Sequence, residues 1–154
     1  MRRKLWIAGG ATALFALASL FLYTTRAEDR KEFETVLVHR ACAPWDGPAI
    51  EFEFYTSAAR CGQTKASALR IALWGILSLH AGQEIQLGRD PKLGTASYCP
   101  QENDCEAAKS GSLFIESFER GKGATGHYEF VFPKAGRRTG SFRAAWCDTR
   151  MMCG

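Results

Sequence analysis

The chain has 154 residues, including six cysteines, and a formal net charge of +4 at pH 7. Four of its 20 basic residues lie in the first 26 positions, so the other 16 balance the 16 acidic residues. The remainder of the chain has no excess of positive charge, which argues against a nucleic-acid partner.

Residues 1–26 have the pattern of a membrane-targeting segment. Three basic residues at positions 2–4 precede an uncharged, mostly apolar run over residues 5–23. A helix of that length is roughly 28 Å long, close to the hydrocarbon thickness of about 30 Å. The sequence therefore predicts a signal anchor over 1–26 that spans the cytoplasmic membrane once, through residues 5–23.

Residues 27–154 are predicted to form a domain in the periplasm or outside the cell. The basic cluster at the extreme N-terminus and the cysteines downstream both favour this orientation. The alternative is a signal peptide cleaved near Ala27, because residues 25–27 offer small side chains at plausible cleavage positions.

All six cysteines follow the apolar segment, and an even number in an exported domain predicts a disulfide framework. Their spacing leaves the 15 possible connectivities open; we expect cysteines that are neighbours in the sequence to pair. No short C-x2-C spacing occurs, so we expect neither a metal site nor a cofactor. The expected pairs are Cys42 with Cys61, Cys99 with Cys105, and Cys147 with Cys153.

Alternation of apolar and polar residues predicts a series of short strands. It is clearest at 50–55, where Ile50, Phe52 and Phe54 alternate with Glu51, Glu53 and Tyr55. A helix over 66–79 also fits the composition there, but Gly75 and the alternation favour a strand. The strands expected before the C-terminal hairpin are 33–38, 50–55, 69–74, 84–87 and 113–118.

Residues 126–147 predict a β-hairpin. If 134–136 form its loop, with Gly136 as the left-handed residue, Tyr128 faces Phe142 and Phe130 lies opposite Gly140. Both aromatic rows then fall on one face.

Residues 88–111 show no alternation and predict a long loop closed by the Cys99–Cys105 disulfide. Together these features predict an all-β domain, a small disulfide-stapled antiparallel β-sandwich or flattened barrel.

No residue pattern indicates a catalytic site. Glu51 and Glu53 emerge about 7 Å apart on one sheet face, a spacing compatible with sugar hydrolysis. A solvated strand face on which Arg70 pairs with either carboxylate explains them as well. The three histidines are widely spaced, and no nucleophile motif is present.

The remaining candidates are interaction residues, and they favour a non-catalytic binding protein, an accessory subunit with a protein partner in a membrane or envelope complex. One alternative is an inhibitor or immunity-type protein that blocks an envelope-acting enzyme with residues 88–111 or 43–48. A hydrolase acting through Glu51, Glu53 or a histidine is the third hypothesis. The candidate interaction residues are Trp45, Trp74, Glu102, Asp104, Arg137 and Arg138.

Overall fold

A computed structural model describes residues 32–63, 66–76, 79–88, 93–101, 103–148 and 153. They belong to one compact unit, Lys31–Gly154. The predicted anchor at 1–26 lies outside the described residues, and within those residues no helix is long and apolar enough to cross a membrane.

The described residues form one nine-stranded sheet with the order β4-β7-β8-β9-β1-β2-β3-β5-β6. All neighbouring strands are antiparallel except β1 and β9, which run parallel. The strands are β1 (Thr35–Cys42), β2 (Pro48–Tyr55), β3 (Leu69–Trp74), β4 (Gln83–Leu87), β5 (Gly94–Gln101), β6 (Asp104–Ala107), β7 (Ser110–Glu119), β8 (Gly123–Phe132) and β9 (Gly136–Cys147).

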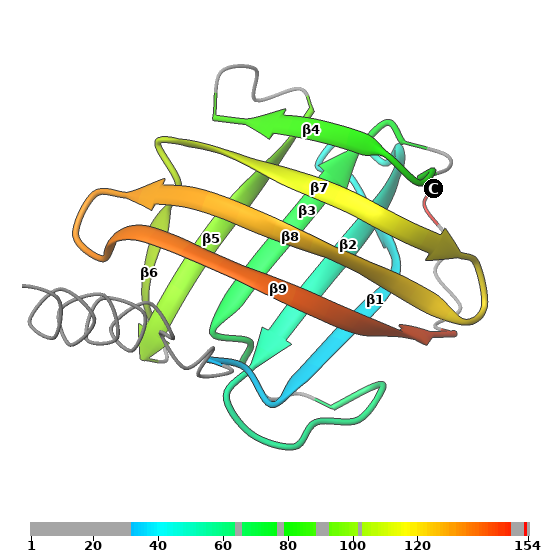
Figure 1. Cartoon of the computed structure of the whole chain (residues 1–154), viewed down its shortest axis with the longest axis horizontal. Helices are drawn as coiled ribbons and strands as arrows, with labels where there is room; N and C mark the ends of the chain where they lie inside the picture. The colour runs from blue at the N-terminus through cyan, green and yellow to red at the C-terminus, as the bar shows by residue number, and fades with distance from the viewer. Residues whose placement is uncertain are drawn as a thin grey trace, which may run out of the picture. The chain divides into compact units, whose positions relative to one another are not determined.

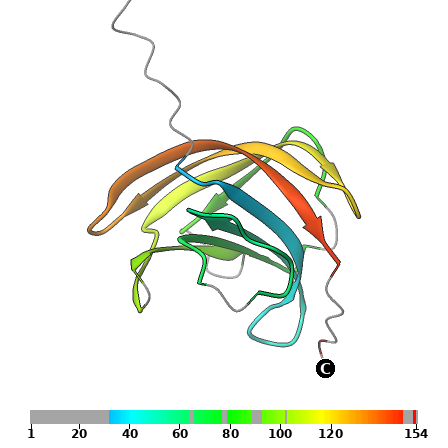
Figure 2. The ribbon, with the colours of Figure 1, turned by 90° about the horizontal axis from the view of Figure 1, so that it is seen from below.

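The sheet curls into a half-barrel, so that β4, β7, β8 and β9 cross in front of β1, β2, β3 and β5 in Figure 1. Figure 2 shows β8 and β9 arching over the β2 and β3 strands. One apolar core fills the space between, and every strand except β6 contributes to it. The all-β prediction is thereby confirmed. Fully buried core residues include Val38, Phe52, Phe54, Ile71, Leu113 and Phe130.

The C-terminal hairpin forms, but its predicted register was wrong by two residues. Gly136 is left-handed as expected, with φ of 71°, yet it also pairs with Phe132, so the loop begins one residue earlier. Tyr128 therefore lies opposite Gly140, and Phe142 lies opposite Gly126. A two-residue shift keeps every side chain on its face, so the aromatic rows still point inward.

Gly140 makes room for an aromatic ring, as predicted, but the ring belongs to Tyr128 rather than Phe130. A Cβ at position 140 would lie 2.7 Å from the Tyr128 hydroxyl oxygen and 3.0 Å from its ring carbons. Any larger residue there would displace a buried aromatic side chain.

The prediction of a long loop over 88–111 was also wrong, because this segment contains β5 and β6. Ala96 and Tyr98 face the core while Thr95 and Ser97 alternate with them. The small and hydroxyl-bearing side chains hide this alternation in the sequence, although Thr and Tyr suit strands.

The structure contains three disulfides, of which only Cys99–Cys105 was predicted correctly; it links β5 to β6. The others are Cys42–Cys153 and Cys61–Cys147, so two sequential pairings were wrong. The parallel pairing of β1 with β9 explains the difference. It places Cys147 beside His39, so β9 ends near the end of β1 where Cys42 lies.

The Cys61–Cys147 disulfide holds the segment after β2 against the outer face of the sheet. In this segment Ala59 packs against a small cluster of Leu37, Tyr55 and Cys147. The amide of Ala59 also donates a hydrogen bond to the Thr35 hydroxyl at 3.2 Å. The outer face of β1 and β2 is thus partly covered by the chain itself.

Candidate binding sites

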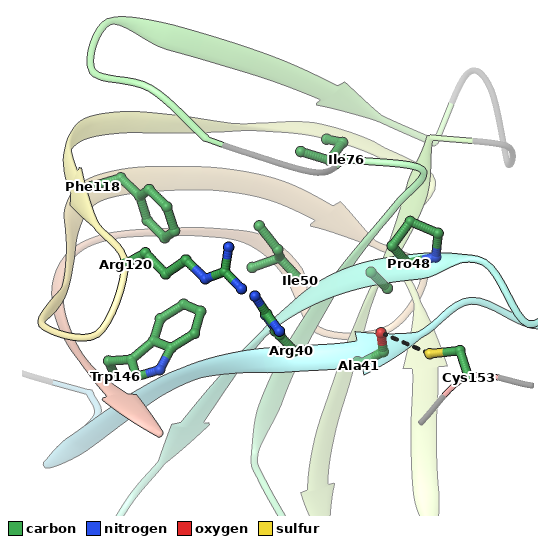
Figure 3. A pocket seen from close by; sticks show the side chains of 10 residues that line it. Arg40, Ala41, Pro48, Ile50, Ile76, Phe118, Arg120, Trp146 and Cys153 are labelled. Atoms are coloured by element: carbon green, nitrogen blue, oxygen red, sulfur yellow. Dashed lines mark hydrogen bonds between the residues drawn. The ribbon is translucent and has the colours of Figure 1, made fainter. Parts of the chain in front are cut away.

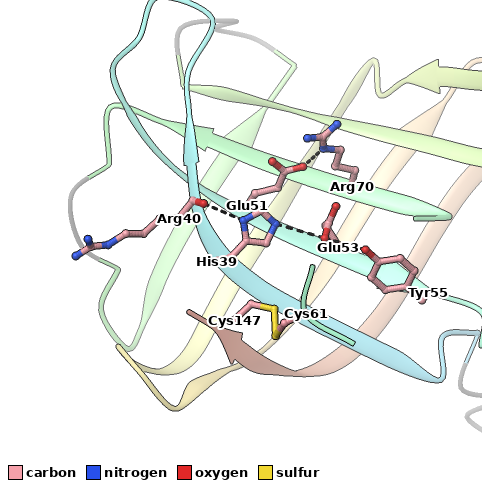
Figure 4. A network of polar contacts seen from close by, with 8 residues as sticks. All are labelled: His39, Arg40, Glu51, Glu53, Tyr55, Cys61, Arg70 and Cys147. Carbon is pink, nitrogen blue, oxygen red and sulfur yellow. Dashed lines mark hydrogen bonds and ion pairs between the residues drawn. A yellow bond between two sulfur atoms is a disulfide. The ribbon is translucent and has the colours of Figure 1, made fainter. Parts of the chain in front are cut away.

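Five polar side chains form a group on the outer face of β1 to β3, here called the outer-face cluster (Figure 4). They alternate with the inward apolar rows and therefore point away from the core. His39 Nε2 lies 3.3 Å from Glu53 Oε2, and the Tyr55 hydroxyl donates to the same oxygen at 2.8 Å. The members of the cluster are His39, Glu51, Glu53, Tyr55 and Arg70.

Contact between His39 and Glu53 shifts the pKa of both groups. The hydrogen bond to Glu53 raises the pKa of His39 against the opposing effect of burial, and the same bond lowers the pKa of Glu53. Burial, followed by the bond to Glu53, raises the pKa of the Tyr55 hydroxyl. His39 Nδ1 is also committed, since it lies 2.9 Å from the Arg40 carbonyl oxygen. The groups satisfy one another, which is the pattern of a structural network.

Glu51 is only 3% exposed and forms an ion pair with Arg70, which was predicted to meet either Glu51 or Glu53. The solvated strand face expected around these carboxylates was wrong for Glu51. Arg70 Nε contacts Glu51 Oε1, and this ion pair with the half-exposed Arg70 compensates the charge of the buried carboxylate. Of the proposed hydrolytic pair, Glu51 is thus buried in an ion pair, whereas Glu53 is 23% exposed and contacts His39 and Tyr55.

Three of the charged candidate residues are bound within the chain. Asp104 accepts from Lys134 Nζ at 3.3 Å, and an Arg137 nitrogen lies 2.8 Å from Glu129. Arg138 donates to Glu32 at 3.1 Å and places its guanidinium 4.7 Å from the Tyr98 ring centre. The fourth, Glu102, lies outside the described residues.

The two tryptophan candidates lie together. Trp45 occupies the turn between β1 and β2, and its ring packs edge-on against Trp74 with ring centres 5.4 Å apart. Trp74 is half-buried beside Ala41 and Ala49, whereas Trp45 is 54% exposed, more than any other large apolar residue that the structure describes. The sequence analysis named both residues as interaction candidates but gave no sign of their contact.

A pocket of about 480 Å³, here called the open-end pocket, lies where the half-barrel opens (Figure 3). Ile50 forms its floor as part of the core, and half-buried Phe118 and Trp146 pack edge-on with ring centres 6.0 Å apart. Figure 3 shows the Arg40 and Arg120 side chains directed into the space between these apolar groups. The lining residues are Arg40, Ala41, Pro48, Ala49, Ile50, Ile76, Phe118, Arg120, Trp146 and Cys153.

Sequence reasoning missed Arg40 and Arg120, although one signal for Arg40 was available. The row Val36, Val38, Arg40 continues an inward alternation along β1, so an arginine stands where the pattern expects an apolar residue. The predicted strand ended at 38 and left Arg40 out. Arg120 follows β7 in a turn, where no periodicity indicates its direction.

No protein-family model matches this chain, and no curated protein or solved structure shows significant similarity to it. Function is therefore inferred from the side chains of the three regions above: the outer-face cluster, the tryptophan turn and the open-end pocket.

Proposed function

We propose that this chain is a membrane-tethered, non-catalytic binding protein, an accessory subunit of a membrane or envelope complex. Residues 5–23 provide the tether, and the β-domain lies on the periplasmic or outer side. Three disulfides in one small domain support this location, because such bonds persist in oxidising compartments. Trp45 provides the main contact with a protein partner, and its exposure carries the proposal.

Trp45 is exposed on a turn that fixes its position. The Ala43 amide donates to the Gly47 carbonyl at 2.8 Å, and the Asp46 amide donates to the Ala43 carbonyl at 3.0 Å. A Cβ at Gly47 would lie 2.7 Å from Trp45 Nε1, so the indole lies directly over this glycine. A ring already held in place loses little conformational entropy on binding, and tryptophan is enriched among the residues that dominate interfaces.

Native purification tests the proposal. The full chain, tagged at its C-terminus through a linker, is extracted in mild detergent, and the co-purifying proteins are identified and quantified by mass spectrometry. We expect one stoichiometric membrane assembly with residues 1–26 still present. Trp45→Ala should lower the affinity for that assembly at least tenfold, as expected for a dominant contact.

The matched control is Val131→Ala, which shortens another exposed apolar residue on β8 and should leave the assembly intact. An untethered monomer that begins near Ala27 and carries no membrane partner would contradict the proposal. Unchanged recovery of the assembly with Trp45→Ala would show that the contact lies elsewhere.

The same turn supports a second candidate function, inhibition of an envelope-acting enzyme. Because β5 and β6 lie within 88–111, the turn at 43–48 is the better of the two segments for insertion into an enzyme. This function predicts a soluble one-to-one complex with a cell-wall hydrolase and loss of that enzyme's activity. Trp45→Ala would then abolish inhibition, whereas an accessory subunit would leave hydrolase rates unchanged.

A further inference from the structure

The open-end pocket results from three inward-facing rows that continue beyond the core. On β1 the row runs from buried Val38 to Arg40, and on β9 it runs from buried Ala144 to Trp146. Val38 and Trp146 are register partners, which places the two strand ends side by side. The third row leads from Phe118 on β7 to Arg120 in the following turn.

The β7–β8 turn is anchored at this rim by the backbone. The Trp146 amide donates to the Lys122 carbonyl at 3.1 Å, and the Lys122 amide donates to the Glu119 carbonyl at 3.0 Å. Phe118 and Trp146 meet edge-on across the same edge. The pocket is therefore formed by regular strands and a fixed turn, which makes it preorganised for a ligand.

The described residues leave the charges of Arg40 and Arg120 uncompensated. Neither Arg40 nor Arg120 forms an ion pair or side-chain hydrogen bond with any described residue. The nearby Glu119 pairs instead with Lys122 at 2.6 Å. Asp148 joins Arg40 and Arg120 around an adjoining hollow of about 230 Å³ but pairs with neither. Among the described residues, Arg40 and Arg120 are therefore the charged groups that line the pocket, and Asp148 lines only the adjoining hollow.

We propose that the open-end pocket binds an amphipathic anion, a carboxylate or phosphate group attached to an apolar body. Arg40 and Arg120 hold the anionic group, because a guanidinium fork matches the geometry of both anions and forms strong charge-assisted hydrogen bonds. Ile50, Ile76, Phe118 and Trp146 receive the apolar body. The volume of about 480 Å³ lies within the usual range of small-molecule sites.

This site is separate from the protein contact proposed above. Trp45 does not line the pocket, although Ala41 and Ala49, which pack against its partner Trp74, are lining residues. Loss of the pocket ligand and loss of the protein partner can therefore be scored independently, by Arg40→Gln and Trp45→Ala respectively.

Calorimetric titration of the full chain tests the proposal. The purified protein is placed in phosphatidylcholine nanodiscs, with empty nanodiscs as the blank, and titrated with octanoate, octyl phosphate, 1-octanol or inorganic phosphate. We expect saturable binding of octanoate and octyl phosphate, with at least tenfold weaker binding of the neutral alcohol and of the bare anion. Arg40→Gln and Arg120→Gln should each weaken octanoate binding about tenfold or more.

The control is Arg143→Gln. It removes an exposed arginine of β9 that likewise forms no ion pair with a described residue but alternates with the inward row of Phe142 and Ala144. This variant should bind octanoate like the parent protein. The proposal is overturned if the anions show no saturable binding, if 1-octanol binds as tightly as octanoate, or if all three arginine variants behave alike.

Two sources could supply such an anion, a free amphiphile or a phospholipid of the membrane. Nanodiscs containing phosphatidylglycerol distinguish them. A lipid phosphate that occupies Arg40 and Arg120 would weaken the apparent binding of octanoate, and this competition would disappear in the arginine variants. Unchanged octanoate binding in these nanodiscs would identify a free amphiphile as the ligand instead. Either result is consistent with an amphipathic anion bound by Arg40 and Arg120.

Discussion

His39 and Arg40 are neighbours in the chain, yet they belong to two regions with opposite electrostatic character. His39 faces outward, where Glu53 contacts both His39 and Tyr55, and where Arg70 forms an ion pair with Glu51. Arg40 faces the open end of the half-barrel, where Arg120 adds a like charge and no described residue pairs with either.

The comparison separates polar residues that stabilise the fold from those available to a ligand. Groups paired within the chain contribute to stability, and their removal leaves a partner uncompensated. Groups that converge without partners contribute little to stability and gain a strong interaction only when a counter-charge arrives. Variants of the outer-face cluster should therefore affect unfolding, and variants of the open-end arginines should affect binding.

Each region has a nearby disulfide whose loss should have the largest effect. Cys61–Cys147 closes 86 residues beside the outer-face cluster, and Cys42–Cys153 closes 111 beside the open-end pocket. Loop-closure entropy predicts that paired serine substitutions lower the unfolding free energy by about 5 kcal/mol in either case. Chemical denaturation under oxidising conditions measures this loss.

The matched control for this prediction is Cys99–Cys105, which spans only six residues. Its replacement by serine should lower the unfolding free energy by about 2 kcal/mol, because a short loop restricts the unfolded chain less. Equal losses for all three pairs would contradict the difference expected from loop length.

Arg70→Gln should lower the unfolding free energy by about 2 kcal/mol, because it leaves the Glu51 carboxylate buried without its cation. The value is below that for a fully buried pair, since Arg70 is 57% exposed and screened by solvent. Urea titration of Arg70→Gln, Glu51→Gln and the double variant forms a double-mutant cycle. Additive losses would mean that the ion pair does not couple the two residues.

The His39–Glu53 pair predicts a stability maximum in mildly acidic solution. The raised pKa of His39 means that its contribution is complete below the unfolded value of 6.5 and lost as pH rises through the folded value. The lowered pKa of Glu53 means that its contribution is complete above 4.5 and lost as pH falls through the folded value. The pair should therefore stabilise most between about 4.5 and 6.5.

Thermal unfolding across this pH range provides the measurement. His39→Gln should remove the part of the decline above pH 6.5 that comes from this pair. His80→Gln, which changes an exposed histidine outside the strands, is the control and should keep the parent profile. A decline that persists unchanged in His39→Gln would assign it to other groups.

The sequence was most informative where side chains alternate strongly between apolar and polar. Ile50, Phe52 and Phe54 define β2 and its inward face, and the aromatic rows of β8 and β9 define the hairpin. It was least informative for contacts between distant segments. The parallel pairing of β1 with β9 determines two disulfides, yet it depends on how the whole sheet closes and leaves no local pattern.

The candidate sites also differ in whether they depend on local sequence or on contacts between distant segments. An exposed Trp45 could be predicted from a turn rich in proline and glycine, because local chemistry determines that turn. The convergence of Arg40 and Arg120 could not, because they are 80 positions apart in the sequence and meet only after β1, β7 and β9 are assembled. Local sequence patterns predict which face of a strand a side chain occupies, whereas the residues of a binding site come together only through the order of the strands in the sheet.

The smallest effect on stability is expected from the open-end arginines, and this is the sharpest test of the comparison. Arg40→Gln and Arg120→Gln should each change the unfolding free energy by no more than about 0.5 kcal/mol, since neither side chain is paired with a described residue. The double variant should be as stable as the parent or slightly more so, because it removes two like charges at one recess. Urea titration without added ligand measures this. A loss comparable with that of Arg70→Gln would mean that the arginines stabilise the half-barrel itself, and the contrast between the two sides of β1 would then fail.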